Sequence, residues 1–353
     1  MMKFRIADRW IGEGQPVFII AELSANHGQQ YETAVKTIET AKAIGADAVK
    51  LQTYTPDTLT IDSDRDCFQI KGGTPWDGLS LHQLYREAYT PWEWQPKLKK
   101  IAEDLGLICF SSPFDRSAVD FLETIAMPAY KIASFEITDI PLIEYIAEKG
   151  KPVLISTGIA SREDIVEAID ACKRMGNQQI ALLKCTSAYP TPLREVNLKT
   201  LADMKDTFDA VMGLSDHTLG RSVPLASVAL GSKIIEKHLI LDRALGGADA
   251  AFSMEPEVFR AMVQGVREVE AALGEVSYAL GEAATKNRQF ARSLFVVENI
   301  QAGEPFTEKN IRSVRPGFGL HPKYWPKVLG KKSKIDMNKG TPLHWHHVEG
   351  VVQ

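Results

Sequence analysis

Polar side chains interrupt a series of short apolar runs in this sequence. Glu22 follows VFIIA, Lys50 and Gln52 interrupt AVKLQTY, and Lys131 lies within AYKIAS. Similar runs carry or end in further polar side chains at Ser111, Ser134, Glu136, Ser156, Ser187, Tyr189 and Ser215. Lysines and carboxylates are costly to bury without partners. We interpret the lysines and hydroxyls as a site for a small anion such as phosphate or a carboxylate. The alternative is that a lysine forms a buried ion pair with a glutamate, and both interpretations can be true together.

Two histidines end consecutive apolar runs. His217 closes GLSDH and His238 closes IIEKH. Neighbouring strands lie ~4.8 Å apart, so two imidazoles at matching ends can converge on one ion. Two nitrogen ligands, with water completing the shell, suit Mn, Mg, Co or Zn. By contrast, His344, His346 and His347 lie in a polar segment, where we expect them to be solvated or to bind metal adventitiously.

The elements that must position these side chains recur along the chain. Between Val17 and about Leu273 the sequence alternates eight β-branched apolar runs with longer helical patterns such as YETAVKTIETAKAIGAD. Near-continuous apolar strands separated by helices indicate parallel strands buried on both faces. Eight such units in roughly 250 residues predict a closed (β/α)8 TIM barrel, with its active site at the carboxyl ends of the strands. An open doubly wound sheet is the alternative, but no G-x-G-x-x-G follows the first run.

The pattern changes after this region. We expect a barrel domain over 1–273, a linker of small and polar residues over 274–286, and a C-terminal domain over 287–353. Frequent Gly and Pro predict a β-rich C-terminal domain. A domain so small has a thin core, so we expect it to lean on a partner surface. Its RPGFGLHP segment holds Arg315 between turns, a presentation suited to a carbonyl or carboxylate.

Composition excludes several classes of protein. With 44% hydrophobic and 24% charged residues and a net charge of −4, the chain is typical of a globular protein without a nucleic-acid partner. The N-terminal segment is charged and is interrupted by Gly and Pro, so we expect neither a signal peptide nor a membrane span there. The four scattered cysteines form no CxxC pair, and we expect buried, reduced thiols in a cytoplasmic protein. They are Cys67, Cys109, Cys172 and Cys185.

The sequence resembles the sialic acid synthase family along nearly its whole length. The motifs that carry the resemblance are IAELSANHGQ, GADAVKLQTYTPDTLT, YKIASFE, STGIA, KCTSAYPTP, GLSDHTLG, IEKHL and RPGFGLHP. Within the family, AELSANH, IKGGTPWDG and FGLHP are most similar to the pseudaminic acid branch, with the N-acetylneuraminate and legionaminate branches as alternatives.

This resemblance implies an architecture and a reaction. A barrel would be followed by an antifreeze-like (SAF, β-clip) domain, in a domain-swapped homodimer whose small domains each cover the partner's barrel. The reaction would condense phosphoenolpyruvate with an open-chain acetamido-sugar aldehyde, releasing phosphate by C–O cleavage. For the pseudaminic branch the sugar would be 2,4-diacetamido-2,4,6-trideoxy-altrose.

The resemblance also implies residue roles. His217 and His238 match metal-binding histidines, for Mn, Mg or Co, and Arg315 matches an arginine that reaches the N-acetyl group from the partner. The positions expected to hold phosphoenolpyruvate are Lys50, Ser111, Lys131, Ser134, Ser156, Ser187 and Ser215. Those expected near the sugar or its aldehyde are Glu22, Gln52, Glu136, Tyr189 and Asp249. Either Glu22 or Glu136 would orient water onto C2 of phosphoenolpyruvate.

Two departures from the N-acetylneuraminate pattern concern the sugar. Ser187 stands where many N-acetylneuraminate enzymes have Asn, and GGADAAFS replaces their G-P-D-H around Asp249. Two other functions remain open from the residues. A Schiff-base aldolase would use Lys131 or Lys184, and a non-catalytic protein would bind a ligand through its C-terminal domain. The many polar strand ends favour an enzyme over the latter.

Overall fold

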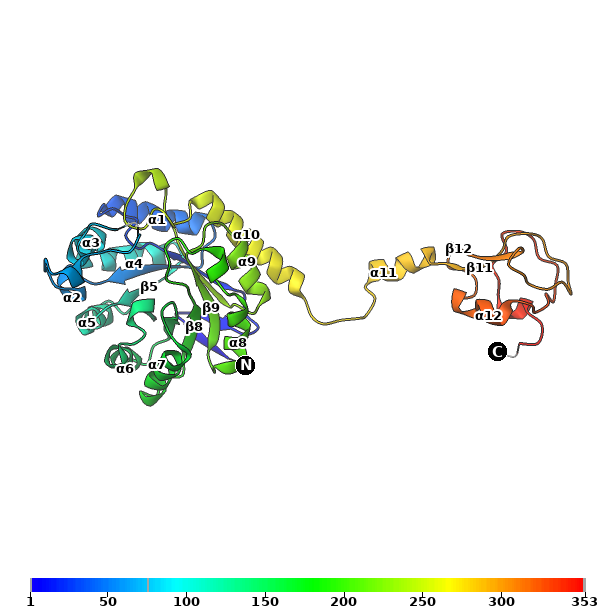
Figure 1. The fold of residues 1–353 in the computed structure, drawn as a ribbon, viewed down its shortest axis with the longest axis horizontal. Helices are drawn as coiled ribbons and strands as arrows, with labels where there is room; N and C mark the ends of the chain where they lie inside the picture. Colours follow the sequence, from blue (N-terminus) through cyan, green and yellow to red (C-terminus); the bar gives the residue numbers. More distant parts are fainter. Residues whose placement is uncertain (1, 75, 352–353) are drawn as a thin grey trace. The chain divides into compact units, whose positions relative to one another are not determined.

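A computed structural model describes residues 2–74 and 76–351 of the chain. The chain divides into two compact units, one extending to Gly274 and the other starting at Glu275 (Figure 1). The first unit is a closed barrel in which every neighbouring pair of strands is parallel. Its strands are β3 (Phe18–Glu22), β4 (Ala48–Thr53), β5 (Ile108–Pro113), β6 (Tyr130–Ile132), β7 (Val153–Ser156), β8 (Ile180–Lys184), β9 (Val211–Asp216) and β10 (Ile234–His238). The predicted (β/α)8 barrel is confirmed, and the open sheet is excluded.

Helices follow the strands and bury an apolar stripe against the outside of the barrel. In α7, for example, the Ser161 hydroxyl caps the first turn by accepting from Asp164 N, and Ile165, Ala168 and Cys172 face inward at helical spacing. The helices that connect successive strands are α1 (Tyr31–Ala43), α4 (Gln95–Asp104), α5 (Arg116–Thr124), α6 (Ile140–Ala147), α7 (Arg162–Arg174), α8 (Lys199–Thr207) and α9 (Ser222–Ala229), and α10 (Pro256–Leu273) follows β10.

A hairpin that the sequence did not predict fills the amino-terminal end of the barrel. Strands β1 (Lys3–Ile6) and β2 (Arg9–Gly12) pair antiparallel. Their Phe4, Ile6 and Ile11 side chains pack with the barrel interior, including Phe18 and Phe110. Apolar side chains therefore fill this end of the barrel, and the polar side chains of the interior lie at the carboxyl ends of the strands.

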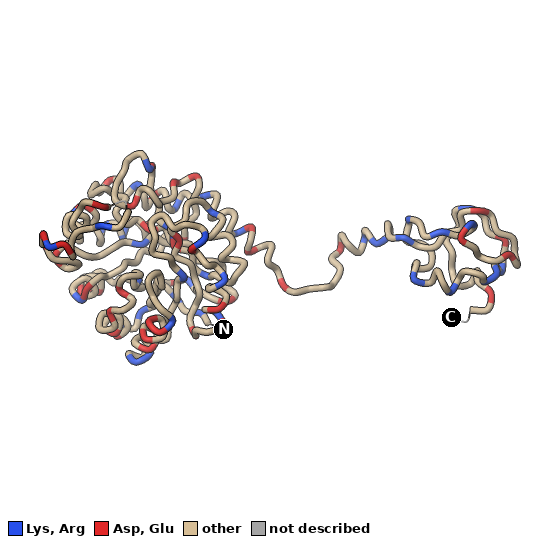
Figure 2. The backbone as a smooth tube through the Cα atoms, viewed as in Figure 1, with Lys and Arg blue, Asp and Glu red and all other residues tan. Residues whose placement is uncertain are grey.

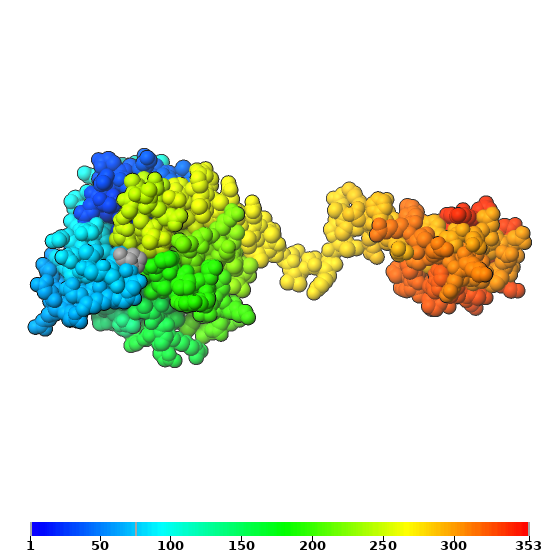
Figure 3. All heavy atoms as spheres, turned by 45° about the horizontal axis from the view of Figure 1, so that its top comes forward, coloured from blue at the N-terminus to red at the C-terminus, as the bar shows by residue number. Residues whose placement is uncertain are grey.

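An insertion between β4 and α4 builds one flank of the barrel unit, light blue in Figure 3. It contains α2 (Pro56–Leu59), the 3-10 turn η1 (Asp66–Phe68) and α3 (Leu81–Ala88). Trp76 within it donates from Nε1 to the carbonyl oxygen of Ala248, at 2.7 Å. This bond ties the insertion to the loop that follows β10.

The second unit has its own small core around Leu294, Val296, Phe306 and Leu343. Up to residue 351, it contains two regular strands, β11 (Ser293–Val296) and β12 (Ile311–Val314), which pair antiparallel. Its short helical turns include α11 (Glu282–Asn287) and α12 (Trp325–Val328). Isolated bridges such as Ile300 to Met337 complete it. Residues 275–281 carry neither helix nor strand.

Three of the predicted buried cysteines are buried, but Cys67 is exposed in η1, because that turn lies on the surface of the insertion. All four are free thiols. Acidic and basic residues are interspersed over the outer helices of the barrel unit (Figure 2). Of the helices in the described residues, none combines the length and apolarity needed to cross a bilayer.

Candidate active site

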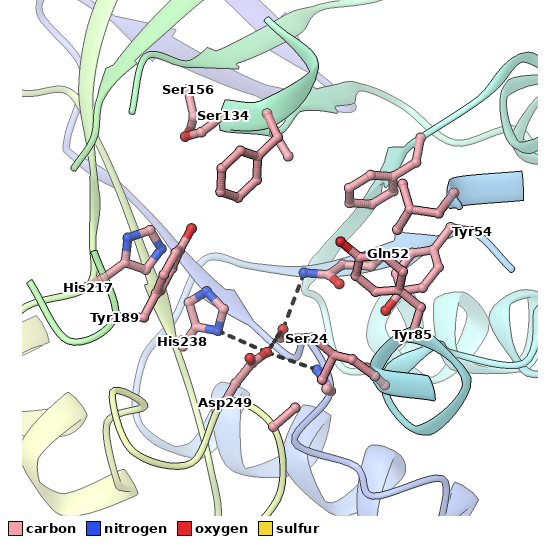
Figure 4. Close-up of a pocket in the computed structure, with 18 of the residues that line it drawn as sticks. Ser24, Gln52, Tyr54, Tyr85, Ser134, Ser156, Tyr189, His217, His238 and Asp249 are labelled. Carbon is pink, nitrogen blue, oxygen red and sulfur yellow. Dashed lines mark hydrogen bonds and ion pairs between the residues drawn. The ribbon is translucent and has the colours of Figure 1, made fainter. Parts of the chain in front are cut away.

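A cavity of about 500 Å³ opens at the carboxyl ends of the barrel strands. The strand-end residues expected from the sequence converge on it because parallel strands in a closed barrel all end at one rim. Its lining includes Lys50, Gln52, Lys131, Ser134, Glu136, Ser156, Tyr189, Ser215, His217, His238 and Asp249. Figure 4 shows several of these side chains facing one another across the cavity.

Four buried charges cluster at the floor of this cavity, and three of them, Lys50, Lys131 and Glu236, line it. Lys50 Nζ lies 2.9 Å from Glu22 Oε2 and 3.4 Å from Glu236 Oε1, and Lys131 Nζ lies 4.0 Å from Glu236 Oε1. All four side chains are at most 5% exposed. Each buried charge therefore has a partner of opposite sign, which makes its burial tolerable. The buried Lys–Glu pair and the polar pocket of the sequence analysis occur together.

Glu22 and Glu136 have pKa values raised to about neutrality. Burial raises the pKa of Glu22 to about 7, although Lys50 opposes the shift. Burial likewise raises the pKa of Glu136 to about 7, against the charge of Lys131. The two differ in their contacts. Glu22 accepts from Gln52 at 2.9 Å and pairs with Lys50, whereas Glu136 Oε2 is buried without a hydrogen-bond partner among the described residues.

The lysines respond differently to the same surroundings. Burial lowers the pKa of Lys131. Burial alone would also lower the pKa of Lys50, but the carboxylates of Glu22 and Glu236 outweigh it and raise that pKa. Burial would raise the pKa of Glu236, and the two lysines instead lower it. At neutral pH, Glu22 is thus the floor group closest to gaining a proton.

Hydroxyl groups beside Lys131 form a cradle suited to an anion. Lys131 Nζ donates to Ser156 Oγ at 2.6 Å, and Gly158 N donates to Ser134 Oγ at 3.2 Å. The Ser187 hydroxyl is buried with no hydrogen-bond partner in the described part of the chain. A Cβ on Gly158 would lie 2.6 Å from Ser134 Oγ and would overlap the Ser187 hydroxyl. Only glycine therefore leaves room for both hydroxyls beside this backbone.

Ser111 lies elsewhere than expected. Its hydroxyl is 2.6 Å from Thr53 Oγ1, which also contacts Gln95 of α4, on the outer face of the barrel. The adjacent Ser112 instead accepts from Lys50 Nζ, at 3.2 Å. The reason is strand alternation, since Ser112 shares the inward side of β5 with Phe110. Had alternate positions been counted along this strand from Phe110, the sequence would have indicated Ser112 as the inward-facing serine.

The two histidines lie on adjacent strand ends with ring centroids 5.3 Å apart. His217 Nδ1 is 3.3 Å from the Thr186 carbonyl oxygen and 3.8 Å from Cys185 Sγ, which leaves Nε2 available. His238 Nδ1 is buried and has no hydrogen-bond partner within the described residues, the nearest carboxylate, Asp249, being 3.8 Å away. Burial, and next the neighbouring His217, hold the pKa of His238 well below its usual range, so the ring is neutral, as a metal ligand must be.

These features fit a divalent cation bound by two imidazoles. No group of three or more His, Cys, Asp or Glu side chains is arranged as a metal site within residues 2–74 and 76–351. A cation here would therefore take two nitrogens from the protein and complete its shell with water or substrate, as mixed nitrogen and oxygen sites for Mn and related ions do. The unpartnered nitrogen of His238 is the structural sign that supports it.

Polar groups from β3, β4 and the loop after β10 form another part of the wall. Asp249 accepts from the Ser24 hydroxyl and from Ala25 N, and burial raises its pKa. Gln52 Nε2 donates to Ser24 Oγ at 3.2 Å and to Glu22. Figure 4 shows this group facing His238. It presents both hydrogen-bond donors and acceptors to a ligand.

Of the aromatic side chains that line the cavity, only Tyr189 was expected from the sequence, and Tyr54, Trp76, Tyr85, Phe114 and Phe252 were not. Tyr189 lies 4.6 Å from His217, 4.9 Å from Phe252 and 5.6 Å from Trp76, measured between ring centroids. Tyr54, Tyr85, Phe114, Leu59, Ile70 and Leu84 add apolar surface. Trp76 belongs to IKGGTPWDG, a motif that marked the family branch without a role for the tryptophan.

Arg315 belongs to the second unit, where it is exposed on the turn after β12. The Ser293 hydroxyl donates to the Pro316 carbonyl oxygen at 2.7 Å and accepts from Gly319 N at 2.8 Å. These bonds hold the turn to β11, so the turn presents Arg315 from a fixed backbone.

Comparison with known proteins identifies the family. Residues 37–278 match the NeuB family, and residues 291–349 match the SAF domain. The chain belongs to the NeuB family. The expected membership of the sialic acid synthases, with an antifreeze-like domain after the barrel, is therefore confirmed.

Individual relatives carry the comparison further. The chain is 48% identical to a pseudaminic acid synthase of Campylobacter jejuni, covering 93% of this chain and 95% of that protein. It is 45% identical to a pseudaminic acid synthase of Helicobacter pylori, covering 95% and 98%. Among solved structures, an N-acetylneuraminic acid synthetase of Leptospira borgpetersenii in complex with citrate is similar with a TM-score of 0.73 and 29% identity, covering 81% of this chain and 95% of that one.

Proposed function

We propose that this chain condenses phosphoenolpyruvate with 2,4-diacetamido-2,4,6-trideoxy-altrose and releases phosphate, the activity of a pseudaminic acid synthase. The relatives from Campylobacter and Helicobacter support this activity at 45–48% identity. The structural observation that carries it is a cavity with two unlike parts. One part is a lysine and serine cradle, and the other is an apolar wall of aromatic side chains.

The cradle suits phosphoenolpyruvate. Lys131, Ser134, Ser156 and Ser187 would hold its phosphate, and Lys50 its carboxylate, through charge-assisted hydrogen bonds. The floor carries two lysines against two carboxyls. Because the pKa of Glu22 is about 7, uptake of one proton leaves a net positive charge that favours an anion.

The chemistry follows from what the cavity positions. C3 of phosphoenolpyruvate bonds to the aldehyde carbon of the sugar, and positive charge develops at C2. Glu136, whose Oε2 is free among the residues described, would take a proton from the water that adds to C2. The former aldehyde oxygen takes up a proton and becomes a hydroxyl. The C2–O bond to phosphate then breaks, phosphate leaves, and the hydroxyl added at C2 loses its proton to give the ketone. A divalent cation (Mn²⁺, Mg²⁺ or Co²⁺) held by His217 and His238 would polarise the aldehyde oxygen.

The other part of the cavity suits a deoxy, diacetamido sugar. Trp76, Tyr189 and Phe252 offer apolar surface to methyl groups, which this sugar carries at C6 and on both acetamido groups. Asp249 and Gln52 offer hydrogen bonds to its amide and hydroxyl groups. N-acetylmannosamine, with hydroxyls at C4 and C6, would leave polar groups against apolar surface.

Two further parts of the proposal concern assembly and location. The exposed Arg315 on its fixed turn supports a homodimer in which the second unit of one protomer covers the barrel of its partner and contacts the N-acetyl group. Free cysteines and a biosynthetic activity support a cytoplasmic enzyme.

Steady-state kinetics with three sugars test the proposed substrate. The sugars are N-acetylmannosamine, 2,4-diacetamido-2,4,6-trideoxy-mannose and its altrose epimer, each with saturating phosphoenolpyruvate. We expect kcat/KM for the altrose sugar to exceed that for N-acetylmannosamine by at least ~10²-fold, because unpaired buried polar groups are strongly penalised. Trp76→Ala should narrow this preference, whereas Trp10→Ala, on β2 at the other end of the barrel, should preserve it. Comparable efficiency on both sugars would assign the chain to N-acetylneuraminate synthesis, and preference for the mannose sugar to legionaminate synthesis.

A further inference from the structure

A buried ion pair lies directly behind the two histidines. Lys237 Nζ donates to Asp216 Oδ2 at 2.6 Å, and the two side chains are 1% and 2% exposed. The two residues are register partners across β9 and β10. Each is also the chain neighbour of one histidine, since Asp216 precedes His217 and Lys237 precedes His238. The pair therefore joins the two histidine-bearing strand ends by a side-chain bond.

Strand alternation places this pair on the side opposite the cavity. His217 and His238 line the cavity, so Asp216 and Lys237 face the outer layer between barrel and helices. Elsewhere along β9 and β10 this outer side carries apolar residues such as Met212 and Ile235. The pair is thus a pair of charges in an otherwise apolar layer.

Thr218 extends the contact to the other side of His217. Lys237 Nζ donates to the Thr218 carbonyl oxygen at 2.6 Å. Asp216 accepts from Thr218 N at 3.1 Å and from its hydroxyl at 3.0 Å. The residues before and after His217 are therefore both held by the same pair. The His217 carbonyl oxygen also accepts from Thr191 N, at 3.0 Å.

Stability is a poor explanation for such a pair, because well-packed apolar residues of similar volume usually stabilise a fold as much or more. We propose that Lys237 and Asp216 are positioning residues that fix the separation of the His217 and His238 imidazoles, so that both bind one divalent cation. This inference rests on the cation of the proposed function. Residues that do not bind a metal themselves commonly keep its histidine ligands in position. We infer this role for the pair on the outer face of β9 and β10.

The test is Mn²⁺ affinity of the full-length, metal-free protein, measured by electron paramagnetic resonance of free Mn²⁺ without substrates. Lys237→Met removes the cation of the pair and leaves Asp216 unpaired. Lys237→Met combined with Asp216→Asn removes both charges and keeps an oxygen for Thr218. Both proteins should bind Mn²⁺ about 10–100-fold more weakly than the wild type. Thermal unfolding of the metal-free proteins is measured in parallel.

The double variant separates positioning from folding. It should regain much of the melting temperature that Lys237→Met loses, since no buried charge is left unpaired, but it should not regain Mn²⁺ affinity. Asp47→Asn is the matched control. Asp47 is a partly buried carboxylate at the amino-terminal end of β4 that pairs with Arg9 and Arg267 and accepts from Ile19 N, so its loss should lower the melting temperature and leave Mn²⁺ affinity within about twofold.

The outcomes distinguish this inference from the proposed function. Weakened Mn²⁺ binding in both Lys237 variants, with stability recovered in the double variant, supports the positioning role. Wild-type affinity in Lys237→Met, or affinity that recovers together with stability, overturns the positioning role alone. A wild-type protein that binds no Mn²⁺ overturns the histidine cation site and this inference together, while the condensation itself is decided separately by the sugar kinetics.

Discussion

Replacing Glu136 with Gln tests which carboxylate handles the proton of the attacking water. Burial raises the pKa of Glu136 to about 7. A group that accepts a proton must be ionised, so activity should fall as the pH drops through that value. At a pKa of about 7 the ionised fraction is about 9% at pH 6 and about 91% at pH 8, which predicts an approximately tenfold rise in rate over this range.

The assay is kcat from pH 6 to 8 for three proteins, with both substrates saturating so that the effect of Glu22 protonation on phosphoenolpyruvate binding does not enter the rate. Glu136→Gln should lower the rate by about 10²–10⁴-fold and abolish its dependence on this ionisation. Glu22→Gln, at the other carboxyl with a pKa of about 7, should keep the acidic limb, because both Glu22 oxygens are already held by Gln52 and Lys50. Substrate ionisation is common to all three proteins and cancels in the comparison. An acidic limb that persists in Glu136→Gln and disappears in Glu22→Gln would refute the assignment.

Three further perturbations test other parts of the site. Gly158→Ala should raise KM for phosphoenolpyruvate by about tenfold or more, because the added Cβ would displace the Ser134 and Ser187 hydroxyls. A charge-assisted hydrogen bond contributes ~1.5–3 kcal/mol, which sets this magnitude. An unchanged KM would contradict the assignment of these hydroxyls to phosphate binding. Exhaustive chelation should abolish turnover, and Mn²⁺ or Mg²⁺ should restore it. His238→Ala should lower the rate on the order of 10²-fold. Full activity in the presence of chelator would contradict a required cation. Arg315→Ala should raise KM for the sugar by roughly ten- to a hundred-fold. Mixing Arg315→Ala chains with His238→Ala chains should restore part of the activity by subunit exchange. Subunit exchange without recovery of activity would contradict a site shared between protomers.

The barrel could be predicted from the sequence because its signal is repeated. Eight apolar runs alternate with helical patterns, and each run became one strand of the closed barrel. Strand ends must meet at one rim, so Lys50, Lys131 and the two histidines could be grouped from the sequence alone. Ser111 shows the limit of motif matching, since strand alternation turns its hydroxyl outward and brings Ser112 to Lys50.

Other features depend on contacts that local sequence does not encode. The hairpin β1–β2 is short and ordinary in composition, and only its packing with Phe18 and Phe110 shows that it fills the barrel. Trp76 reaches the cavity through a bond to Ala248, which is 172 residues away. The Lys237–Asp216 pair likewise forms only once β9 and β10 are in register. Such long-range contacts cannot be read from periodicity.

In the proposed reaction, this cavity joins phosphoenolpyruvate to the altrose sugar with cleavage of the C2–O bond. Phosphoenolpyruvate labelled with oxygen-18 at its bridging position tests it in one reaction, read by mass spectrometry of both products. We expect one labelled phosphate for each nine-carbon sugar acid formed, and a product without label at C2. Label retained in the sugar acid, or a pyruvate adduct trapped on Lys131 by borohydride, would rule out this C–O cleavage mechanism.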